Sequence, residues 1–217
     1  MTAREEDILT SKALIKNGTV ITELIRSCVV DKRIDVRQML AGDRNALMVG
    51  IRITGYGADY DVEIECNECG QRQETTFDLG ALQIKRLAIE PVSNGQNLFE
   101  FMLPVSKKKV VFKFITGADE EEISRILDKR KDLGTAIDPT VTTRLRFCLV
   151  SVDGNTDGAQ ITRFVSSMLA RDSRALRGFI DKNEPGIDMK GTFRCKHCAY
   201  EEEVPMPLGA GFFWPKS

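Results

Sequence analysis

The chain has 217 residues, of which 42% are hydrophobic, enough to bury one good core or two small ones. Its 31 lysine and arginine residues nearly cancel its 32 aspartate and glutamate residues, so it lacks the overall positive field of a typical nucleic-acid binder. It has no run of about 18 apolar residues, and its charged N-terminus does not resemble a secretory signal. We therefore expect a soluble protein made in a cytoplasm, without a membrane partner.

The first 60 residues predict a helical region. Apolar residues at helical spacing indicate a short helix or an extended arm over Glu6–Lys16 and a helix over Val20–Val30. A third helix is expected to begin at a cap formed by Asp43. It should end at the glycines of residues 55–57, because glycine tolerates the left-handed conformation that closes many helices.

Asp43, Arg44 and Arg52 lie in this third predicted helix. A catalytic set is one interpretation of these charged residues. No histidine or nucleophile accompanies them, so we prefer a cap and pairs of charges on the helix surface.

Two Cys-x-x-Cys motifs are the most specific feature of the sequence, Cys66-Asn67-Glu68-Cys69 and Cys195-Lys196-His197-Cys198. Each lies between two runs that alternate like β-strands. If the motifs face each other, they supply four thiolates in a tetrahedron, the arrangement of a structural zinc site. The stretch between them is far longer than the roughly 15 to 20 residues of a compact zinc ribbon. The intervening chain must therefore fold so that its ends meet.

Such a site would be closed, with four sulfur ligands and no open position, so its Zn2+ would hold the fold together and catalyse nothing. His197 lies inside a motif whose thiolates already occupy that side of the tetrahedron, and we interpret it as a bystander. Thioredoxin-like redox chemistry is the competing interpretation, but neither motif opens a helix after a strand. Cys28 and Cys148 lie in apolar runs and are expected to be small buried residues.

Residues 80–188 predict a mixed α/β insertion that is helical in its second half. The expected elements are a β-hairpin with strands Leu98–Pro104 and Lys107–Ile115, a helix opening at Thr116, a helix from Asp138-Pro139 to Val152, a helix over Ile161–Leu169, and a helix capped by Asp172.

Two short charged stretches of the insertion admit a functional interpretation. Lys107–Lys109 could contact phosphate, but a solvated hairpin tip is the better interpretation. Asp153–Gly158 resembles the start of a calcium loop, but Phe164 stands where the twelfth-position glutamate is required, so a turn is the better interpretation.

The end of the chain, residues 207–217, carries three adjacent aromatic residues, Phe212, Phe213 and Trp214. They either fold back onto the core or dock into another protein, because large aromatic side chains are common interface anchors. The sequence leaves both possibilities open. We treat the three residues as the candidate partner-binding site.

These elements predict an α+β fold. A split zinc-ribbon-like β element, residues 61–79 and 189–206, is expected to close around the insertion. The helical region 1–60 precedes the ribbon and the aromatic tail 207–217 follows it.

Several short motifs, taken in their order, resemble the baseplate hub proteins of contractile-tailed phages, of the T-even hub-assembly type. They are Gly42-Asp43-Arg44-Asn45-Ala46-Leu47, Arg52-Ile53-Thr54-Gly55-Tyr56-Gly57, Cys66-x-x-Cys69-Gly70, Pro185-Gly186-Ile187-Asp188, Phe193-Arg194-Cys195-x-x-Cys198 and Phe212-Phe213-Trp214-Pro215. The resemblance covers nearly the whole chain, although residues 98–170 match in character more than in identity.

The resemblance implies a non-enzymatic protein of phage tail morphogenesis that helps to assemble the central hub of the baseplate or remains in it. Its partners would be other hub or tail proteins, without nucleic acid or a small-molecule substrate. It would be found in the host cytoplasm during assembly or in the baseplate of the virion tail. The aromatic tail, the acidic strand Glu201–Glu203 and the basic hairpin are candidate contact surfaces.

Two other classes of function remain open. A zinc-ribbon nucleic-acid-binding factor should carry basic and aromatic residues around its cysteines, whereas the flanks here carry mostly glutamates, among them Glu63, Glu65, Glu68, Glu74 and Glu201–Glu203. A metalloenzyme or redox protein is the other class. The sequence shows neither a Gly-rich phosphate loop nor a Ser/His/Asp set to support it.

Overall fold

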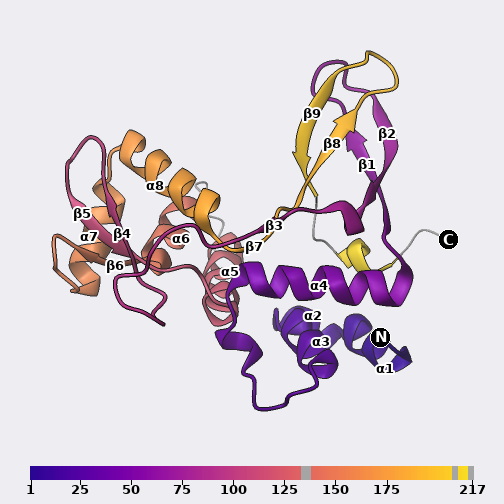
Figure 1. The fold of residues 1–217 in the computed structure, drawn as a ribbon, viewed down its shortest axis with the longest axis horizontal. Helices are drawn as coiled ribbons and strands as arrows, with labels where there is room; N and C mark the ends of the chain where they lie inside the picture. Colours follow the sequence, from indigo (N-terminus) through magenta and orange to yellow (C-terminus); the bar gives the residue numbers. More distant parts are fainter. Residues whose placement is uncertain (133–137, 207–209, 215–217) are drawn as a thin grey trace.

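The computed structural model describes residues 1–132, 138–206 and 210–214. Helices and small antiparallel sheets form two bodies that lie side by side (Figure 1). One body combines the N-terminal helices with the strands that flank the cysteines, and the other contains the insertion. The predicted mixture of helices and small strands is confirmed. None of the helices among the described residues has the length and apolar character needed to cross a membrane.

The N-terminal region is helical, as predicted. It contains α1 (Ala3–Thr10), α2 (Lys12–Lys16), α3 (Val20–Cys28), the 3-10 helix η1 (Val36–Gln38) and α4 (Ala41–Tyr56). The first predicted helix is divided at Ser11, whose side chain accepts a hydrogen bond from the backbone N–H of Leu14 and caps α2. The predicted cap at Asp43 is wrong. The cap of α4 is Leu40. Asp43 lies in the first turn, where its negative charge interacts favourably with the exposed backbone N–H groups.

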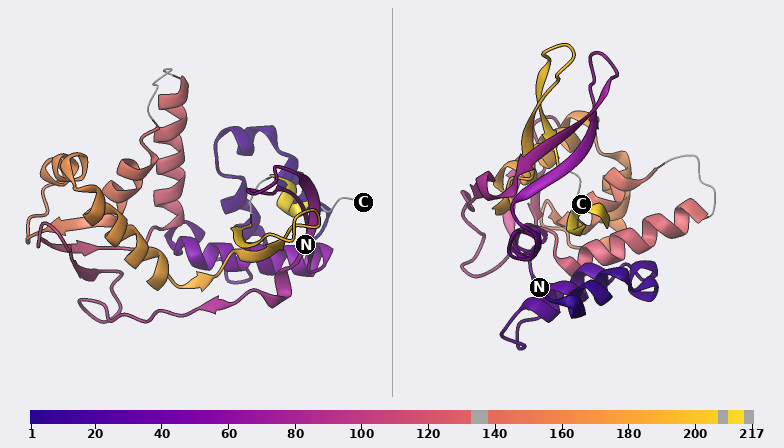
Figure 2. Two further views of the ribbon diagram at one scale, coloured as in Figure 1. Left: turned by 90° about the horizontal axis from the view of Figure 1, so that it is seen from above. Right: turned by 90° about the vertical axis from the view of Figure 1, so that its right-hand side faces the viewer.

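Two antiparallel hairpins rise side by side from this helical base (Figure 2). We call them the paired hairpins. The first joins β1 (Asp59–Glu65) to β2 (Arg72–Asp78), and the second joins β8 (Lys190–Arg194) to β9 (Glu201–Pro205). Gly57, with φ of 87°, ends α4 and turns the chain into β1.

The insertion contains a three-stranded sheet covered by helices. Its sheet has the order β4-β5-β6 and is antiparallel throughout. The elements are β4 (Phe99–Met102), β5 (Lys109–Phe112), α5 (Gly117–Asp132), α6 (Thr140–Cys148), β6 (Leu149–Val152), α7 (Gly158–Ser167) and α8 (Ala170–Asn183). We call β4–β6 with α6–α8 the insertion lobe. The predicted hairpin and helices are present, but the prediction that the helix after Pro139 continues to Val152 is wrong, because Leu149–Val152 pairs with β5.

Asp172 has a different role from the predicted helix cap. The cap of α8 is Leu169, and Asp172 lies in the first turn with a side chain that is 1% exposed. Its carboxylate accepts hydrogen bonds from the backbone N–H groups of Val105 and Ser106, at 2.7 and 3.0 Å. Asp172 therefore fixes the turn of the β4–β5 hairpin against α8.

A short two-stranded ribbon connects the two bodies. β3 (Ile84–Lys85) pairs with β7 (Gly186–Ile187), and β7 crosses the start of α4. A Cβ atom on Gly42 would lie 1.9 Å from the carbonyl oxygen of Pro185, and a Cβ atom on Gly186 would lie 2.7 Å from the Cα atom of Gly42. The two glycines therefore allow the backbones of α4 and β7 to approach so closely that a side chain at either position would clash.

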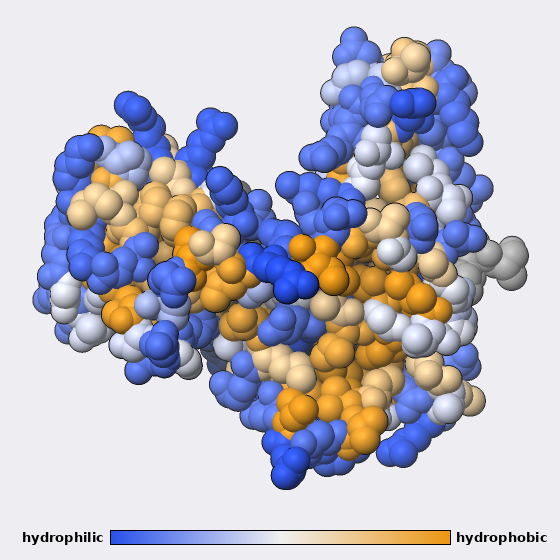
Figure 3. All heavy atoms as spheres, viewed as in Figure 1, coloured by the Kyte–Doolittle hydropathy of each residue, from blue (hydrophilic) through white to orange (hydrophobic). Residues whose placement is uncertain are grey.

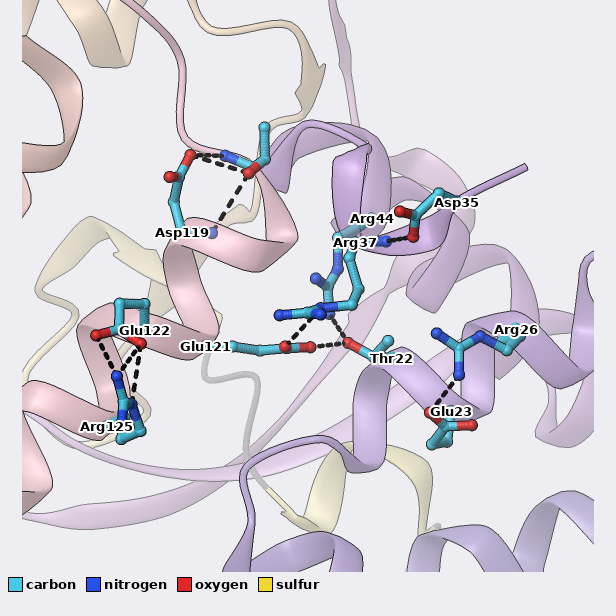
Figure 4. A network of polar contacts seen from close by, with 11 residues as sticks. Thr22, Glu23, Arg26, Asp35, Arg37, Arg44, Asp119, Glu121, Glu122 and Arg125 are labelled. Atoms are coloured by element: carbon cyan, nitrogen blue, oxygen red, sulfur yellow. Dashed lines mark hydrogen bonds and ion pairs between the residues drawn. The ribbon is translucent and has the colours of Figure 1, made fainter. Parts of the chain in front are cut away.

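A polar network provides the second connection between the bodies. Helix α5 stands between them (Figure 2), and its Glu121 accepts hydrogen bonds from Thr22 of α3 and from Arg37 of η1, the latter at 3.0 Å (Figure 4). Arg44 of α4 donates to the Thr22 hydroxyl at 2.9 Å. The predicted surface pairing of Arg44 is wrong, because its side chain is 5% exposed and burial lowers its pKa. Gly117 makes room for it, since a Cβ atom there would lie 1.4 Å from Arg44 Nη1.

Each body has its own apolar core. The first core packs α3 and α4 against the base of the paired hairpins and the end of the chain, through residues such as Leu24, Val49 and Phe77. The second core lies in the insertion lobe and includes the rings of Phe99, Phe112 and Phe114, which contact one another in tilted and edge-on arrangements. The paired hairpins and the insertion lobe therefore rest on different cores.

Candidate metal centre and C-terminal segment

The two cysteine motifs form matching turns at the tips of the paired hairpins. In the first, the backbone N–H of Gly70 donates to the carbonyl of Cys66 at 2.9 Å. In the second, the N–H of Ala199 donates to the carbonyl of Cys195 at 3.2 Å. Gly70 and Ala199 occupy equivalent positions and both adopt positive φ, 68° and 58°. The two motifs therefore present their sulfur atoms in the same local geometry.

The four cysteine sulfur atoms converge on one point. All lie within 4.8 Å of one another, and the pairs Cys66–Cys198 and Cys69–Cys195 are separated by 3.7 Å. Those distances are too long for a disulfide, whose sulfur atoms lie about 2.05 Å apart. Four sulfurs at the usual Zn–S bond length of about 2.3 Å form a tetrahedron with edges of about 3.8 Å. The cluster is therefore compatible with a metal ion of this size and coordination.

The four sulfurs lie close enough to perturb one another's pKa values. Burial acts to raise the pKa of Cys195, but backbone N–H groups of His197 and Cys198 donate to its sulfur and lower that pKa to about 6. A backbone hydrogen bond from Tyr200 acts to lower the pKa of Cys198, but burial and the neighbouring sulfurs raise it to about 12. Four thiolates this close repel one another unless a cation compensates their charge.

The two hairpins are held together by more than the cysteines. The side-chain amide of Gln73 donates to the carbonyl of Arg194 at 2.9 Å and accepts from the backbone N–H of Lys196 at 2.7 Å. Near the tips, Asn67 donates to Glu202 at 2.7 Å. Phe193 is fully buried beside Cys66 and Cys195. Gln73 could not be predicted from the sequence, because a glutamine in an alternating strand gives no signal that it bridges two hairpins.

Among the described residues, the potential metal ligands that lie close enough together to bind one ion are the four cysteine sulfurs. His197 contributes its backbone N–H to Cys195 Sγ at 3.4 Å, and its imidazole is outside that cluster. Cys66 and Cys195 are buried, whereas Cys69 and Cys198 are exposed. Among the cysteines outside the cluster, Cys148 is buried and its pKa rises to about 11 because of burial, while Cys28 is half-buried.

Two of the three candidate partner-binding aromatics are core residues. Phe212 and Phe213, in the 3-10 helix η3 (Ala210–Phe213), are 1% and 2% exposed and pack in the first core. The ring of Phe212 makes an edge contact with Tyr60 at 5.1 Å between centroids. Of the two possibilities that the sequence leaves open for Phe212 and Phe213, their burial favours packing onto the core. The end of the chain folds back onto the core at these two positions.

Arg52 holds this segment in place. Its side chain is 1% exposed and donates to the backbone carbonyls of Phe212, Gly57 and Asp59, at 2.9, 2.6 and 2.8 Å. The same guanidinium lies 5.7 Å from the centre of the Tyr56 ring. The expectation that Arg52 forms a surface charge pair is therefore wrong. It connects α4, the start of β1 and the end of the chain.

Trp214 remains at the surface. Its side chain is 39% exposed, and its ring lies 6.3 Å from that of Tyr56. Tyr56 in turn donates to Glu6 of α1 at 2.5 Å. Residues 207–209 and 215–217 of the predicted tail lie outside the described residues. Of the three aromatic candidates, Trp214 alone has an exposed ring available for a partner.

The two charged stretches of the insertion are engaged within the chain. Lys108 pairs with Asp153 at 2.8 Å and Lys109 with Glu100 at 2.7 Å. Asp153 also accepts from the backbone N–H of Lys109, and Asp157 caps α7. Both stretches therefore make contacts that stabilise the fold. For residues 153–158 this agrees with their interpretation as a turn.

Comparison with known proteins gives a match to a protein family. The family model described as T4 bacteriophage base plate protein matches residues 1–214, which is nearly the whole chain. No curated protein and no solved structure matches the chain. The chain belongs to the T4 bacteriophage base plate protein family.

Proposed function

We propose that the chain is a non-enzymatic component of the baseplate hub, or a factor that assembles the hub, and that it acts through protein–protein contacts. Family membership across residues 1–214 carries this proposal, because it gives the chain a structural role related to the phage baseplate. The narrower assignment to the hub rests on the order of short motifs from Gly42 to Trp214. Its partners are accordingly other proteins of the phage tail.

We further propose that Cys66, Cys69, Cys195 and Cys198 bind one structural Zn2+. The sulfur separations of 3.7 Å and the all-sulfur donor set support this assignment. Four protein ligands leave no position for substrate, so the ion would serve to join the paired hairpins. The ends of a long insertion would then be held together at two points, by the metal and by the β3–β7 ribbon.

A zinc-ribbon factor that binds nucleic acid is the alternative, and the charge of the paired hairpins is unfavourable to it. Residues 61–79 and 189–206 contain nine carboxylates against four lysines and arginines. Two of the four basic side chains are paired, Arg72 with Glu65 at 2.9 Å and Arg194 with Glu201 at 2.7 Å. A surface of this charge repels phosphate.

Purification of assembling and finished tails from infected cells tests the proposed function. We expect the chain to co-purify with hub proteins in assembly intermediates, in finished baseplates or in both, since the first result identifies an assembly factor and the second a component. A nucleic-acid-binding factor would instead co-purify with nucleic acid and be released by nuclease. Absence of the chain from every tail fraction would contradict the proposal.

Trp214 is the residue of the C-terminal segment that we propose for partner contact. Trp214→Ala should weaken recovery of hub partners while leaving the fold intact, because its ring is exposed and its neighbours Phe212 and Phe213 keep the segment packed. Unchanged recovery would remove Trp214 from the contact surface.

A further inference from the structure

An apolar groove lies on the N-terminal helices, on a part of the first body distinct from the metal centre. It has a volume of about 520 Å³ and runs between α4 and the facing ends of α1 and α3. Figure 3 shows hydrophobic side chains gathered over α4 and the helices below it. We call this feature the α4 groove. Its apolar lining includes Met1, Cys28, Val29, Ala46, Leu47 and Ile51.

The face of α4 that lines the groove carries small side chains. Ala46, Gly50 and Thr54 follow one another at intervals of four residues and therefore share one face of the helix. A Cβ atom built on Gly50 would meet nothing within 4 Å. Glycine inside a helix is less stable than alanine, and the packing of this chain does not require it at position 50. Gly42 of the same helix differs, since Pro185 occupies its side-chain space.

The charge in the floor of the groove is already engaged by hydrogen bonds within the chain. Its one lining carboxylate is Glu5, which accepts hydrogen bonds from the hydroxyl of Ser27 at 2.6 Å and from the backbone N–H and hydroxyl of Thr2 at 2.7 Å. These bonds lower the pKa of Glu5 to about 2. An occupant of the groove therefore has to present uncharged, apolar side chains.

The rim of the groove on the side of α1 and α3 is basic. A second depression meets the groove at Ser27 and is lined by Arg4, Arg26 and Lys32 together with a single carboxylate, Glu23. Arg26 pairs with Glu23 at 2.6 Å, whereas Lys32 donates to the backbone carbonyls of Arg26 and Ser27. A positive charge thus remains along this rim.

We propose that the α4 groove binds an amphipathic helix of another tail protein. Its apolar face would lie against Ala46, Gly50 and Thr54, where small side chains allow two helix backbones to approach closely. Acidic residues beside that face would lie over Arg4 and Lys32. That the helix comes from a tail protein rests on the proposed function. That the groove binds an acidic amphipathic helix rests on its lining and rim alone. A contiguous apolar surface of this kind on a folded protein is typical of a protein contact site.

A designed peptide tests the chemistry of the groove directly. The probe is a helical peptide of about 16 residues, long enough to span α4, with a leucine and alanine face flanked by glutamates. A second peptide carries lysines in place of the glutamates. Titration into the full-length, zinc-loaded chain should show at least about tenfold tighter binding of the glutamate peptide, with an affinity that falls as salt is raised. Equal binding of the two peptides would overturn the proposal.

Two glycines supply matched variants for this titration. Gly50→Glu places a carboxylate in the open groove and should weaken binding of the glutamate peptide by about tenfold or more. Gly178→Glu makes the same change at an equally open glycine of α8 in the other body and should leave binding unchanged. Lys32→Glu, at an exposed rim position, should also weaken binding without touching the core. If Gly50→Glu and Lys32→Glu both bind like the unaltered chain, the groove is not the binding site.

Photo-crosslinking in assembling tails identifies the natural occupant. A photo-reactive amino acid at position 50 should crosslink to an acidic amphipathic helix of a tail protein, and the same group at position 178 should not. A crosslink to a second copy of this chain, or none at position 50 in tails that contain the chain, would overturn the proposal. Absence of the chain from all tail fractions would instead contradict the proposed function, and the peptide titration would still decide the chemistry of the groove.

Discussion

The paired hairpins and the insertion lobe are both small β structures, but different forces hold them together. Each hairpin has two strands, and the core between their tips consists of Phe193 with two of the cysteines. Two-stranded hairpins are at best marginally stable in water. The insertion lobe instead has a three-stranded sheet and a core of phenylalanine rings in mutual contact. The bases of the hairpins pack in the first core, but their tips have little apolar packing of their own, so the proposed metal site would stabilise the tips, whereas the lobe is stabilised by apolar packing.

Removing one sulfur ligand should have the largest effect. Cys195→Ser should reduce zinc from about one ion per chain to nearly none and unfold the paired hairpins, because metal binding to such a site is part of the folding free energy. Zinc content and thermal unfolding measure both results. Cys28→Ser, a change at a half-buried cysteine outside the cluster, is the matched control and should retain the metal. Full zinc binding by Cys195→Ser would remove the distinction between the two regions.

A substitution in the phenylalanine core tests the stability of the insertion lobe in the same way. Phe112 is fully buried, and its ring lies within 6 Å of three others, those of Phe99, Phe114 and Phe179. Phe112→Ala should lower the stability of the insertion lobe by about 3–5 kcal/mol while zinc content stays unchanged. Val111→Ala, in the same strand at a half-buried position, should cost clearly less. Loss of zinc from Phe112→Ala would show that the two regions unfold together.

Arg52 tests how the hairpins are joined to the helical base. Arg52→Met leaves the carbonyls of Gly57, Asp59 and Phe212 without their donor and should cost about 1–3 kcal/mol. Because Trp214 is the single tryptophan of the chain, its fluorescence should report release of the C-terminal segment. Arg125→Met, which removes an exposed pair with Glu122, should be nearly neutral. Equal stability of the two variants would contradict the role assigned to Arg52.

Acid should act on the insertion lobe through Asp172. Burial acts to raise the pKa of this carboxyl, but the backbone N–H groups of Val105 and Ser106 lower it below its ordinary value. Its contribution to stability is therefore present above the unfolded pKa of about 3.9 and is lost as the pH falls through the lower folded pKa. Hydrogen exchange of β4 and β5 should accelerate over this range of pH, and Asp172→Asn should flatten the dependence. An equally steep dependence in the variant would exclude Asp172 as its source.

Much of the architecture could be predicted from the sequence because it depends on local patterns. The spacing of the cysteines and the alternating strands beside them predict two hairpins with metal ligands at their tips, and the structure brings the four sulfurs together. Helical periodicity predicts α3, α7 and α8, where apolar residues recur on one face.

The errors arise where tertiary contacts decide the outcome. In the sequence, the short apolar run Leu149–Val152 looks like the continuation of the preceding helix. In the structure it is a strand, because β5 lies beside it and pairs with it. Arg44 and Arg52 carry charges that usually lie at the surface, and only the fold shows the buried hydroxyl and carbonyl groups that receive them. Phe212 and Phe213 were equally compatible with a core or an interface, and the position of α4 and Tyr60 decides for the core.

The central claim is that a metal ion bound by the four cysteines holds the paired hairpins together while the insertion lobe is independent of it. Hydrogen exchange of the full chain, before and after removal of the metal by a chelator, tests this claim most directly. We expect one zinc ion per chain at the start. After chelation, the amides of β1, β2, β8 and β9 should lose their protection, and those of β4, β5 and β6 should keep it. Absence of metal from protein purified without chelator, or equal protection of the hairpins in both states, would contradict the account.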